Sequence, residues 1–423
     1  MKDNLAYQRK IETFKAQTLY PVLDSESKSF IDELVGRYQF TFQEFRQLSE
    51  AARDLNMWGE EALQVHWDQL EQQLEVKLEG VQRKERLLRS FRADLAQLKQ
   101  SPKSYPASGL KKPKRAPLNV VSKESTKPIL GECPVASPKT VCCNLLTLDA
   151  VENCSFGCSY CTIQTFYDDD VVFHKNFREK LEKLELKEDR FYHIGTGQSS
   201  DALVWGNREG ILDDLCDFAA RYPKILLEFK TKSKNVSYFL EQKLPKNVVC
   251  SWTLNTDTII NSEEHFTANL DQRLKAARAV ADCGIKVAFH FHPIVYYDNW
   301  EEEYAALCAR VLGAFSPAEV LFISFGSITF IKPVIQEIRK RGEPTKILQM
   351  ELVPDPHGKL TYPDEVKLQL FHALNKNFTP WHESVYRYLC MERSFFWDEV
   401  FGWHYENNEE FERDFGTQVL KKL

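Results

Sequence analysis

The sequence predicts an α/β protein built on a partial (β/α)6 barrel of the TIM type, with an all-helical N-terminal domain and a C-terminal cap. From residue 144 to residue 341, short β-rich runs alternate with helical patterns in six strand–helix units. Such alternation is typical of a parallel sheet with helices outside it, and right-handed crossovers curl that sheet toward a barrel. Residues 1–100 instead carry apolar residues at three- and four-residue steps, which indicates helices.

Composition places the chain among soluble globular proteins. It has 423 residues, of which 43% are hydrophobic and 27% charged, enough to bury a large core. No segment has the length and apolarity of a signal peptide or a membrane span, and eleven cysteines fit a reducing compartment. We therefore expect a cytoplasmic protein with no membrane partner. The net charge of −6 gives no general attraction to nucleic acid, so any such contact needs a local patch.

Composition shifts divide the chain into four parts. The helical domain covers residues 1–100, and a basic, proline-rich linker covers 101–130. Residues 101–128 hold five prolines and seven Lys or Arg against one acid, Glu124. A spacer is the favoured interpretation of this linker, with phosphate contact as the alternative. The part-barrel is expected over 131–342, and an aromatic-rich cap over 343–423.

Three cysteines follow the first predicted strand. The stretch VENCSFGCSYCTIQTFY, residues 151–167, places Cys154, Cys158 and Cys161 in a C-x3-C-x2-C array. Structural zinc takes four protein ligands, usually as two separated pairs, and the sequence has no second C-x2-C pair. A [4Fe-4S] cluster normally takes four cysteines, so three leave one iron open to a small molecule. The array therefore predicts an iron–sulfur cluster with a vacant coordination position.

A C-x3-C-x2-C array after the first strand of a β/α part-barrel resembles the radical S-adenosylmethionine (SAM) enzymes. The resemblance implies that the open iron binds SAM. It also implies that the reduced cluster cleaves SAM to a 5′-deoxyadenosyl radical, with an electron donor such as flavodoxin or ferredoxin. In such an enzyme the protein positions the reactants and excludes water, while the cofactor carries the chemistry.

Residues 144–340 also resemble spore photoproduct lyase-like proteins. The segments FYHIGTGQSSDAL, LLEFKTKSKNV, VCSWTLNTDTII and VAFHFHPIVYYDNWEEEY follow one another in the order of the family's motifs. The resemblance implies a lyase acting on a damaged or modified nucleic-acid base in DNA repair. It implies these SAM-binding residues: Tyr160, Gly195, Thr196, Gly197, Gln198, Ser200, Asp201, Lys232, Thr253, Asn255 and His292.

Two residues depart from the family pattern. Gln198 stands where the lyase has a hydrogen-donating cysteine, and Thr162 stands where it has a tyrosine. Both family residues quench the product radical, so either another group does so here or the substrate differs. Cys390, in the expected cap, is the candidate replacement donor. Tyr296, with Tyr386 or Tyr388, is a candidate radical relay.

Other interpretations remain open from the sequence. Cys133, Cys142 and Cys143 either hold a second cluster or fill the core, and core filling is favoured. His290 and His292 share one face of a strand, a pattern also found in zinc hydrolases. Two further alternatives are a radical SAM enzyme acting on a peptide or small metabolite, and a non-enzymatic metal-binding adaptor.

Overall fold

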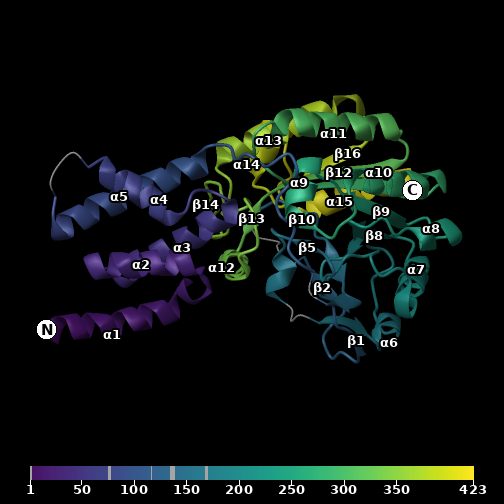
Figure 1. Cartoon of the computed structure of the whole chain (residues 1–423). Coiled ribbons are helices and arrows are strands. Elements are labelled where there is room, and N and C mark those ends of the chain that lie inside the picture. Colours follow the sequence, from purple (N-terminus) through teal and green to yellow (C-terminus); the bar gives the residue numbers. More distant parts are fainter. Residues whose placement is uncertain (1, 75–77, 116, 134–138, 167–169) are drawn as a thin grey trace.

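The centre of the molecule is one eight-stranded sheet. The computed structural model describes residues 2–74, 78–115, 117–133, 139–166 and 170–423 (Figure 1). The sheet order is β16-β12-β11-β9-β8-β7-β3-β2. All neighbours from β3 to β16 are parallel, and only the edge strand β2 is antiparallel. The strands are β2 (Leu130–Glu132), β3 (Leu146–Leu148), β7 (Tyr192–Thr196), β8 (Ile225–Thr231), β9 (Val248–Thr253), β11 (Lys286–Ile294), β12 (Val320–Ser327) and β16 (Tyr386–Leu389).

The six strands expected from the sequence are all present, as β3, β7, β8, β9, β11 and β12. They are buried along almost their whole length, as parallel strands with covered faces are. The sheet does not stop at residue 342, where the barrel was expected to end. β16, from the segment expected to form the cap, pairs with β12 as a seventh parallel strand.

The sheet is curled into a part-barrel. Helix α15 (Asn408–Lys422) contacts β7 as well as β12 and β16, which are far apart in the sheet order. Inside the curl, the rings of His193 on β7 and Phe322 on β12 are 5.9 Å apart, and both pack on Phe415 of α15. A backbone bridge between Val141 and Glu392 links the β2–β3 connection to the chain beyond β16. The C-terminal helix therefore covers the open side of the barrel.

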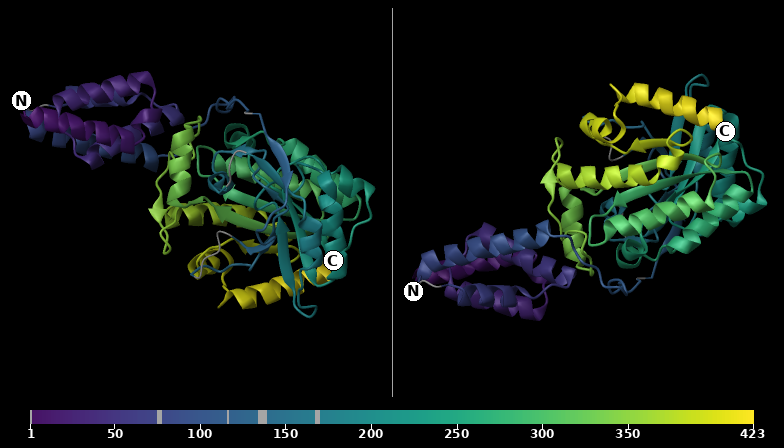
Figure 2. Two further views of the ribbon diagram at one scale, coloured as in Figure 1. Left: turned by 90° about the horizontal axis from the view of Figure 1, so that it is seen from below. Right: turned by 90° about the horizontal axis from the view of Figure 1, so that it is seen from above.

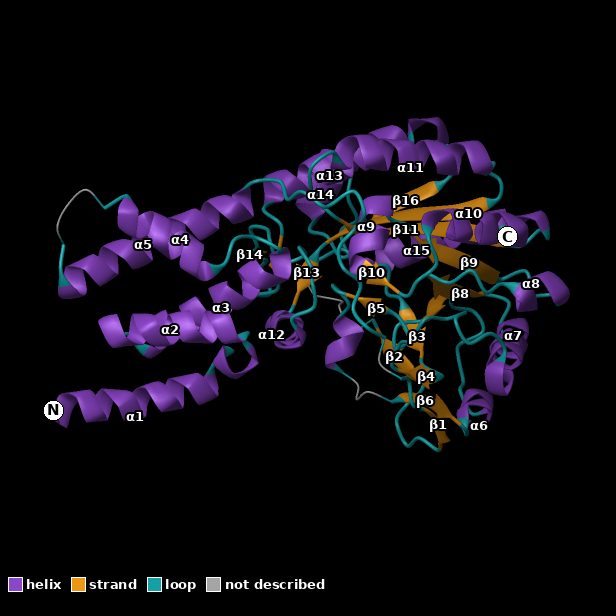
Figure 3. Ribbon diagram, in the orientation of Figure 1, coloured by secondary structure: helices purple, strands orange, loops and turns teal. Residues whose placement is uncertain are grey.

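Helices flank the sheet on its outer side (Figure 3). None of the described helices combines the length and apolar character needed to span a bilayer. The helices after the first strand are α6 (Phe177–Glu182), α7 (Ile211–Arg221), α8 (Ser237–Glu241), α9 (Asp257–Glu263), α10 (Leu270–Asp282), α11 (Trp300–Ala314), α12 (Lys332–Arg341), α13 (Asp364–Asn377) and α14 (Ser394–Phe401). Short 3-10 turns are η1 (Tyr20–Val22), η2 (Thr162–Thr165), η3 (Arg208–Gly210) and η4 (Thr379–Trp381).

Three small sheets lie around the barrel. The order β1-β6-β4 forms one, β10-β5 another and β13-β15-β14 the third. Because β1 lies within residues 101–130, the segment expected to be a linker supplies a strand as well. These strands are β1 (Val120–Lys123), β4 (Val151–Glu152), β5 (Gly157–Cys158), β6 (Val171–His174), β10 (Glu264–His265), β13 (Thr329–Phe330), β14 (Val353–Pro354) and β15 (Leu360–Thr361).

The first hundred residues form a separate helical unit, as the sequence predicts. It consists of α1 (Lys2–Gln17), α2 (Ser25–Arg37), α3 (Phe42–Trp58), α4 (Leu63–Gln72) and α5 (Gly80–Gln100). Helix α3 begins with a capping box, in which Thr41 and Glu44 bond to each other's backbone N–H. The apolar faces meet around Phe45, Trp58 and Trp67, all at most 1% exposed.

The helical unit is attached to the barrel through α12 (Figure 2). Arg339 of α12 makes two hydrogen bonds to the Asp54 carboxylate of α3, at 2.7 and 2.8 Å. Just beyond α12, the Lys346 ammonium lies 2.9 Å from Glu60, and Thr345 N donates to Met57 O at 2.9 Å. Paired charges and backbone bonds therefore fix the unit against the barrel.

We predict that Phe415→Ala destabilises the protein by about 3–5 kcal/mol, since it opens a cavity between α15 and both halves of the sheet. Urea unfolding followed by circular dichroism measures the loss. Leu420→Ala on the same helix is the matched control, because Leu420 is exposed and should cost less than about 0.5 kcal/mol. Equal midpoints for the two variants would contradict the assigned role of α15.

Candidate active site

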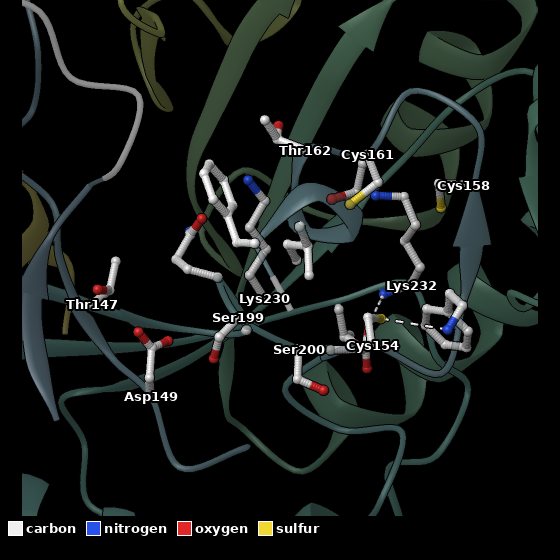
Figure 4. A pocket seen from close by; sticks show the side chains of 18 of the residues that line it. Thr147, Asp149, Cys154, Cys158, Cys161, Thr162, Ser199, Ser200, Lys230 and Lys232 are labelled. Atoms are coloured by element: carbon white, nitrogen blue, oxygen red, sulfur yellow. Dashed lines mark hydrogen bonds between the residues drawn. The ribbon is translucent and has the colours of Figure 1, made fainter. Parts of the chain in front are cut away.

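A cavity of about 450 Å³ opens at the C-terminal ends of the parallel strands (Figure 4). This end is where active sites of β/α barrels lie, and the volume suits a small-molecule ligand. Most of the lining comes from the connections after β3, β7 and β8. The lining residues are Gly131, Glu132, Thr147, Asp149, Cys154, Phe156, Cys158, Tyr160, Cys161, Thr162, Ile163, Phe166, Gly197, Gln198, Ser199, Ser200, Asp201, Lys230, Thr231, Lys232 and Thr253.

The three cysteines belong to one loop, residues 153–161, which we call the cysteine loop. Its first turn is closed by Asn153, whose side-chain oxygen accepts from Cys154 N at 2.8 Å. Its second turn is closed by Cys161 N, which donates to Cys158 O at 3.0 Å. Between these turns, β5 pairs antiparallel with β10, so Cys158 lies opposite Glu264. All three thiols consequently face the same cavity.

The Glu264 carboxylate holds the loop from beneath. It accepts hydrogen bonds from the Tyr160 hydroxyl and, at 2.5 Å, from the Arg273 guanidinium. Burial acts to raise the pKa of Glu264, but Arg273 and Lys232 outweigh it and lower that pKa. Lys232 lies among the three cysteines and 5.8 Å from the Tyr160 ring (Figure 4). The loop thus lies against a buried ion pair whose charges are matched.

The neighbouring carboxylate, Glu263, joins the loop to two other segments. It accepts from the Ser159 hydroxyl, from Tyr105 at 2.8 Å, and from Thr345 Oγ1 and Lys346 N at 2.5 and 2.9 Å. Burial raises the pKa of Glu263, and these four donors act against that rise. Every donor removes part of the cost of burying the group.

The thiols fit an iron–sulfur cluster better than a single metal ion. Within the described residues, no three His, Cys, Asp or Glu side chains are close enough to hold one ion. Sulfur ligands of one zinc lie within about 4.6 Å of each other, twice the Zn–S distance. In a four-iron cluster each cysteine binds a different iron, so the sulfurs stand farther apart. Burial raises the pKa of Cys154 to about 12, so loading iron must displace the proton.

Gly197 brings backbone against the cavity. Its φ is +90°, and a Cβ placed there would lie 2.7 Å from Lys230 O and 3.0 Å from Ala202 N. No side chain can be accommodated without moving backbone, so the close packing of this turn on Lys230 and Ala202 requires glycine. Gly197 lines the cavity, and its role in SAM binding stays a prediction.

Asp201 organises the two loops after β7 and β8. One carboxylate oxygen accepts from Thr231 Oγ1 at 2.7 Å and from Leu203 N and Val204 N at 3.1 and 2.9 Å. The other accepts from Lys232 N at 2.7 Å. With both oxygens engaged by protein donors, Asp201 acts chiefly by positioning Lys232 and the Gly197 turn.

Two buried oxygens in the lining are left unsatisfied by the described protein. Ser200 Oγ and Asp149 Oδ1 are both inaccessible and have no hydrogen-bond partner there. Buried polar atoms are normally satisfied, so these two oxygens mark the polar part of the cavity wall as unusual.

The sequence missed several polar lining residues, namely Glu132, Thr147, Asp149, Ser199, Lys230 and Thr231. Asp149 comes directly after the first barrel strand and Lys230 lies near the end of β8, and those positions are the signal that would have found them. Figure 4 shows Thr147 and Asp149 across the cavity from Cys158 and Cys161.

Four of the eleven residues expected to bind SAM lie outside the cavity lining. Gly195 is within β7 beside the Leu145 side chain, and the Thr196 hydroxyl donates to Glu228 O at 3.3 Å. Asn255 is fully buried and donates to Pro293 O at 3.0 Å. His292 lies in the barrel interior, where its Nε2 is 3.0 Å from Ser324 Oγ. The other seven, including Tyr160 and Thr253, line the cavity with the cysteines.

A hydrogen-bonded chain crosses the barrel interior. The Glu228 carboxylate bonds to Nε2 of both His193 and His290, and Ser324 Oγ lies 2.6 Å from His290 Nδ1 and 3.0 Å from His292 Nε2. Burial lowers the pKa of His290 to about 4 and that of His292 well below its ordinary value, so these two rings are neutral. Because both nitrogens of His290 are engaged, the zinc-hydrolase alternative for His290 and His292 finds no support.

Cys390 and Tyr296, the candidates for radical chemistry, also lie outside the cavity lining. The backbone bridge from Val141 to Glu392 brings Cys142 and Cys143 to the same place as Cys390. Burial raises the Cys390 pKa above its ordinary value. Tyr296 packs on Trp300, with ring centroids 6.1 Å apart. Both departures from the family pattern, Gln198 and Thr162, do line the cavity.

Comparison with known proteins supports the resemblance. The sequence profile of the family described as spore photoproduct lyase matches residues 147–359. Spore photoproduct lyase of Geobacillus is 25% identical over 46% of this chain and 59% of its own length. That of Bacillus subtilis is 28% identical over 46% and 59%. The chain thus spans about six tenths of the length of these curated relatives.

The fold agrees with a solved structure of a spore photoproduct lyase mutant with bound AdoMet and dinucleoside spore photoproduct. The TM-score is 0.53 at 21% identity, and the match covers 64% of this chain and 82% of that one. This likeness confirms the part-barrel expected from the sequence.

We predict that Gly197→Ala lowers stability by about 1–3 kcal/mol, because alanine is strained at φ +90° and its Cβ meets backbone. It should also weaken SAM binding, measured by isothermal titration calorimetry. Gly195→Ala is the matched control, since its Cβ meets only the flexible end of Leu145 at 3.2 Å. A larger loss of thermal stability in Gly195→Ala than in Gly197→Ala would show that the turn at residue 197 does not require glycine.

We also predict that Asp201→Asn weakens SAM binding at least about tenfold while costing about 1–3 kcal/mol of stability, since an amide replaces one acceptor oxygen by a donor. Asp213→Asn, at an exposed carboxylate of α7, is the control. An unchanged affinity for SAM in Asp201→Asn would show that the loops after β7 and β8 do not depend on the Asp201 carboxylate.

Proposed function

Since the chain belongs to the spore photoproduct lyase family, we propose that it is a radical SAM enzyme of the lyase type. Cys154, Cys158 and Cys161 would hold a [4Fe-4S] cluster, with SAM in the adjoining cavity. The bound cluster and SAM supply a carbon-centred radical that abstracts hydrogen from substrate. The observation that carries the proposal is that three thiols line one cavity with the Gly197 turn and two unsatisfied oxygens.

Different residues of this chain would position the ligand and close the cavity. The Gly197 backbone, the Ser200 hydroxyl and the Lys232 ammonium face the ligand, and Asp201 fixes the loops that carry them. Tyr160, held by Glu264, closes the side of the cavity next to Cys161. The apolar side chains of Phe156 and Ile163 reduce access of water to the reacting atoms.

We propose a nucleic-acid substrate, a damaged or modified base, with reduction by a flavodoxin- or ferredoxin-type donor. A related lyase structure contains dinucleoside spore photoproduct, which supports this substrate class. Because Gln198 and Thr162 replace the family's cysteine and tyrosine in the lining, the step that quenches the product radical must use different groups. In duplex DNA the target would have to leave the stack, at a cost of a few kcal/mol.

Anaerobic reconstitution with iron and sulfide, followed by incubation with SAM and dithionite, tests the chemistry. We expect iron binding and release of 5′-deoxyadenosine by the native protein, and the loss of both in Cys161→Ala. Cys283→Ala, at an exposed cysteine of the outer helical layer, should retain both. Cleavage of SAM by Cys161→Ala would refute the proposal.

The substrate is tested by adding ultraviolet-irradiated DNA to the reconstituted enzyme. We expect restored bases to be detected by mass spectrometry, and no restoration without SAM. If SAM is cleaved but the irradiated DNA is unchanged, the proposed radical chemistry is supported and the proposed DNA substrate is wrong.

A further inference from the structure

The basic segment of residues 109–115, which we call the strap, lies against the cysteine loop. At one end, Gly109 packs so closely on Asn261 that a Cβ would lie 3.0 Å from its carbonyl oxygen. At the other end, the Arg115 guanidinium lies 3.4 Å from Ser155 O and 5.2 Å from the Phe266 ring centroid. The strap is therefore a fixed part of the surface that surrounds the cysteine loop.

The strap concentrates positive charge. Lys111, Lys112, Lys114 and Arg115 are all exposed, and residues 103–123 contain no acid. Arg341, the last residue of α12, adds a cation from another element. Burial, with the nearby charges of Lys112 and Arg341, lowers the pKa of His265 to about 4, so both cations act on the same ring. The chain as a whole is acidic, which makes this local patch distinct.

Beneath the strap lie polar atoms without partners. His265 is 1% exposed, and neither of its ring nitrogens has a hydrogen-bond partner in the described part of the chain. The same holds for Nε of Arg341. Leaving such groups buried and unsatisfied is costly. Arg341 as a whole is partly exposed, so its guanidinium can also meet an anion at the surface.

We propose that the strap, with Arg341, binds the phosphate backbone of a nucleic-acid strand and holds it beside the cavity. This rests on the proposed function. Phe166, at the cavity edge, is 56% exposed and offers a ring on which a base can stack. Cations beside the cysteine loop, an exposed aromatic in the cavity lining and a cavity for the reacting group fit a nucleic acid better than an acidic peptide.

The test is the triple variant Lys111→Gln/Lys112→Gln/Lys114→Gln, which leaves Arg115 and its contact with Ser155 intact. Binding of a fluorescein-labelled oligothymidylate is measured by anisotropy at several salt concentrations. Loss of three phosphate contacts should make the slope of log affinity against log salt shallower by about 2, and should weaken binding at low salt at least about tenfold.

The matched control is Lys224→Gln/Lys243→Gln/Lys246→Gln, with the same change of charge at exposed lysines near the N-terminal ends of β8 and β9, away from the cavity. It should bind with nearly native affinity. Three results would each overturn the proposal. They are an equal loss of affinity in both variants, native affinity in the strap variant, and competition by oligoglutamate as strong as by unlabelled oligonucleotide. SAM cleavage by the native protein is also measured in the absence of DNA. This measurement distinguishes failure of the radical chemistry from failure of strand binding.

Discussion

Two adjacent buried carboxylates, Glu263 and Glu264, hold the candidate active site together. Glu264 bonds to Tyr160 and Arg273, which fixes the cysteine loop to the barrel. Glu263 bonds to Ser159 of the same loop, to Tyr105 ahead of the strap and to Lys346 N. An unpaired buried carboxylate costs several kcal/mol, so each group strongly favours the arrangement that supplies its donors. Lys346 in turn pairs with Glu60, which links the helical unit to the same site.

The sequence was sufficient for the barrel and the cysteine loop, because both depend on local pattern. Six β-rich runs with helices between them produce six parallel strands, and cysteine spacing alone places three thiols in one loop. β16 was missed because it is only four residues long and lies in an aromatic-rich segment. Such a strand is recognisable only from its partner β12, which no local pattern reveals.

Side-chain direction was the harder part to predict. Asp201 was expected to bind SAM, and it lines the cavity, but no sequence pattern indicated that its oxygens accept from four protein donors. Asn255 lies in the buried layer behind the cavity, where its side chain accepts from Tyr304 at 2.6 Å. Conversely, Asp149 and Lys230 carry no motif, and their positions at the ends of barrel strands were the one sequence signal for the cavity they line. Long-range hydrogen bonds decide these cases, and sequence spacing does not encode them.

The acidic net charge of the chain does not oppose a nucleic-acid substrate. Screening limits electrostatic attraction to about 8–10 Å at ordinary salt, so a phosphate near the cavity experiences the strap rather than distant acids. The strap is anchored by Gly109 and Arg115 against the elements that hold the cysteine loop. A strand bound there would be presented to the cavity by the same framework that positions the thiols. Placing charge and chemistry on one rigid framework reduces the freedom that a bound base must lose before it reacts.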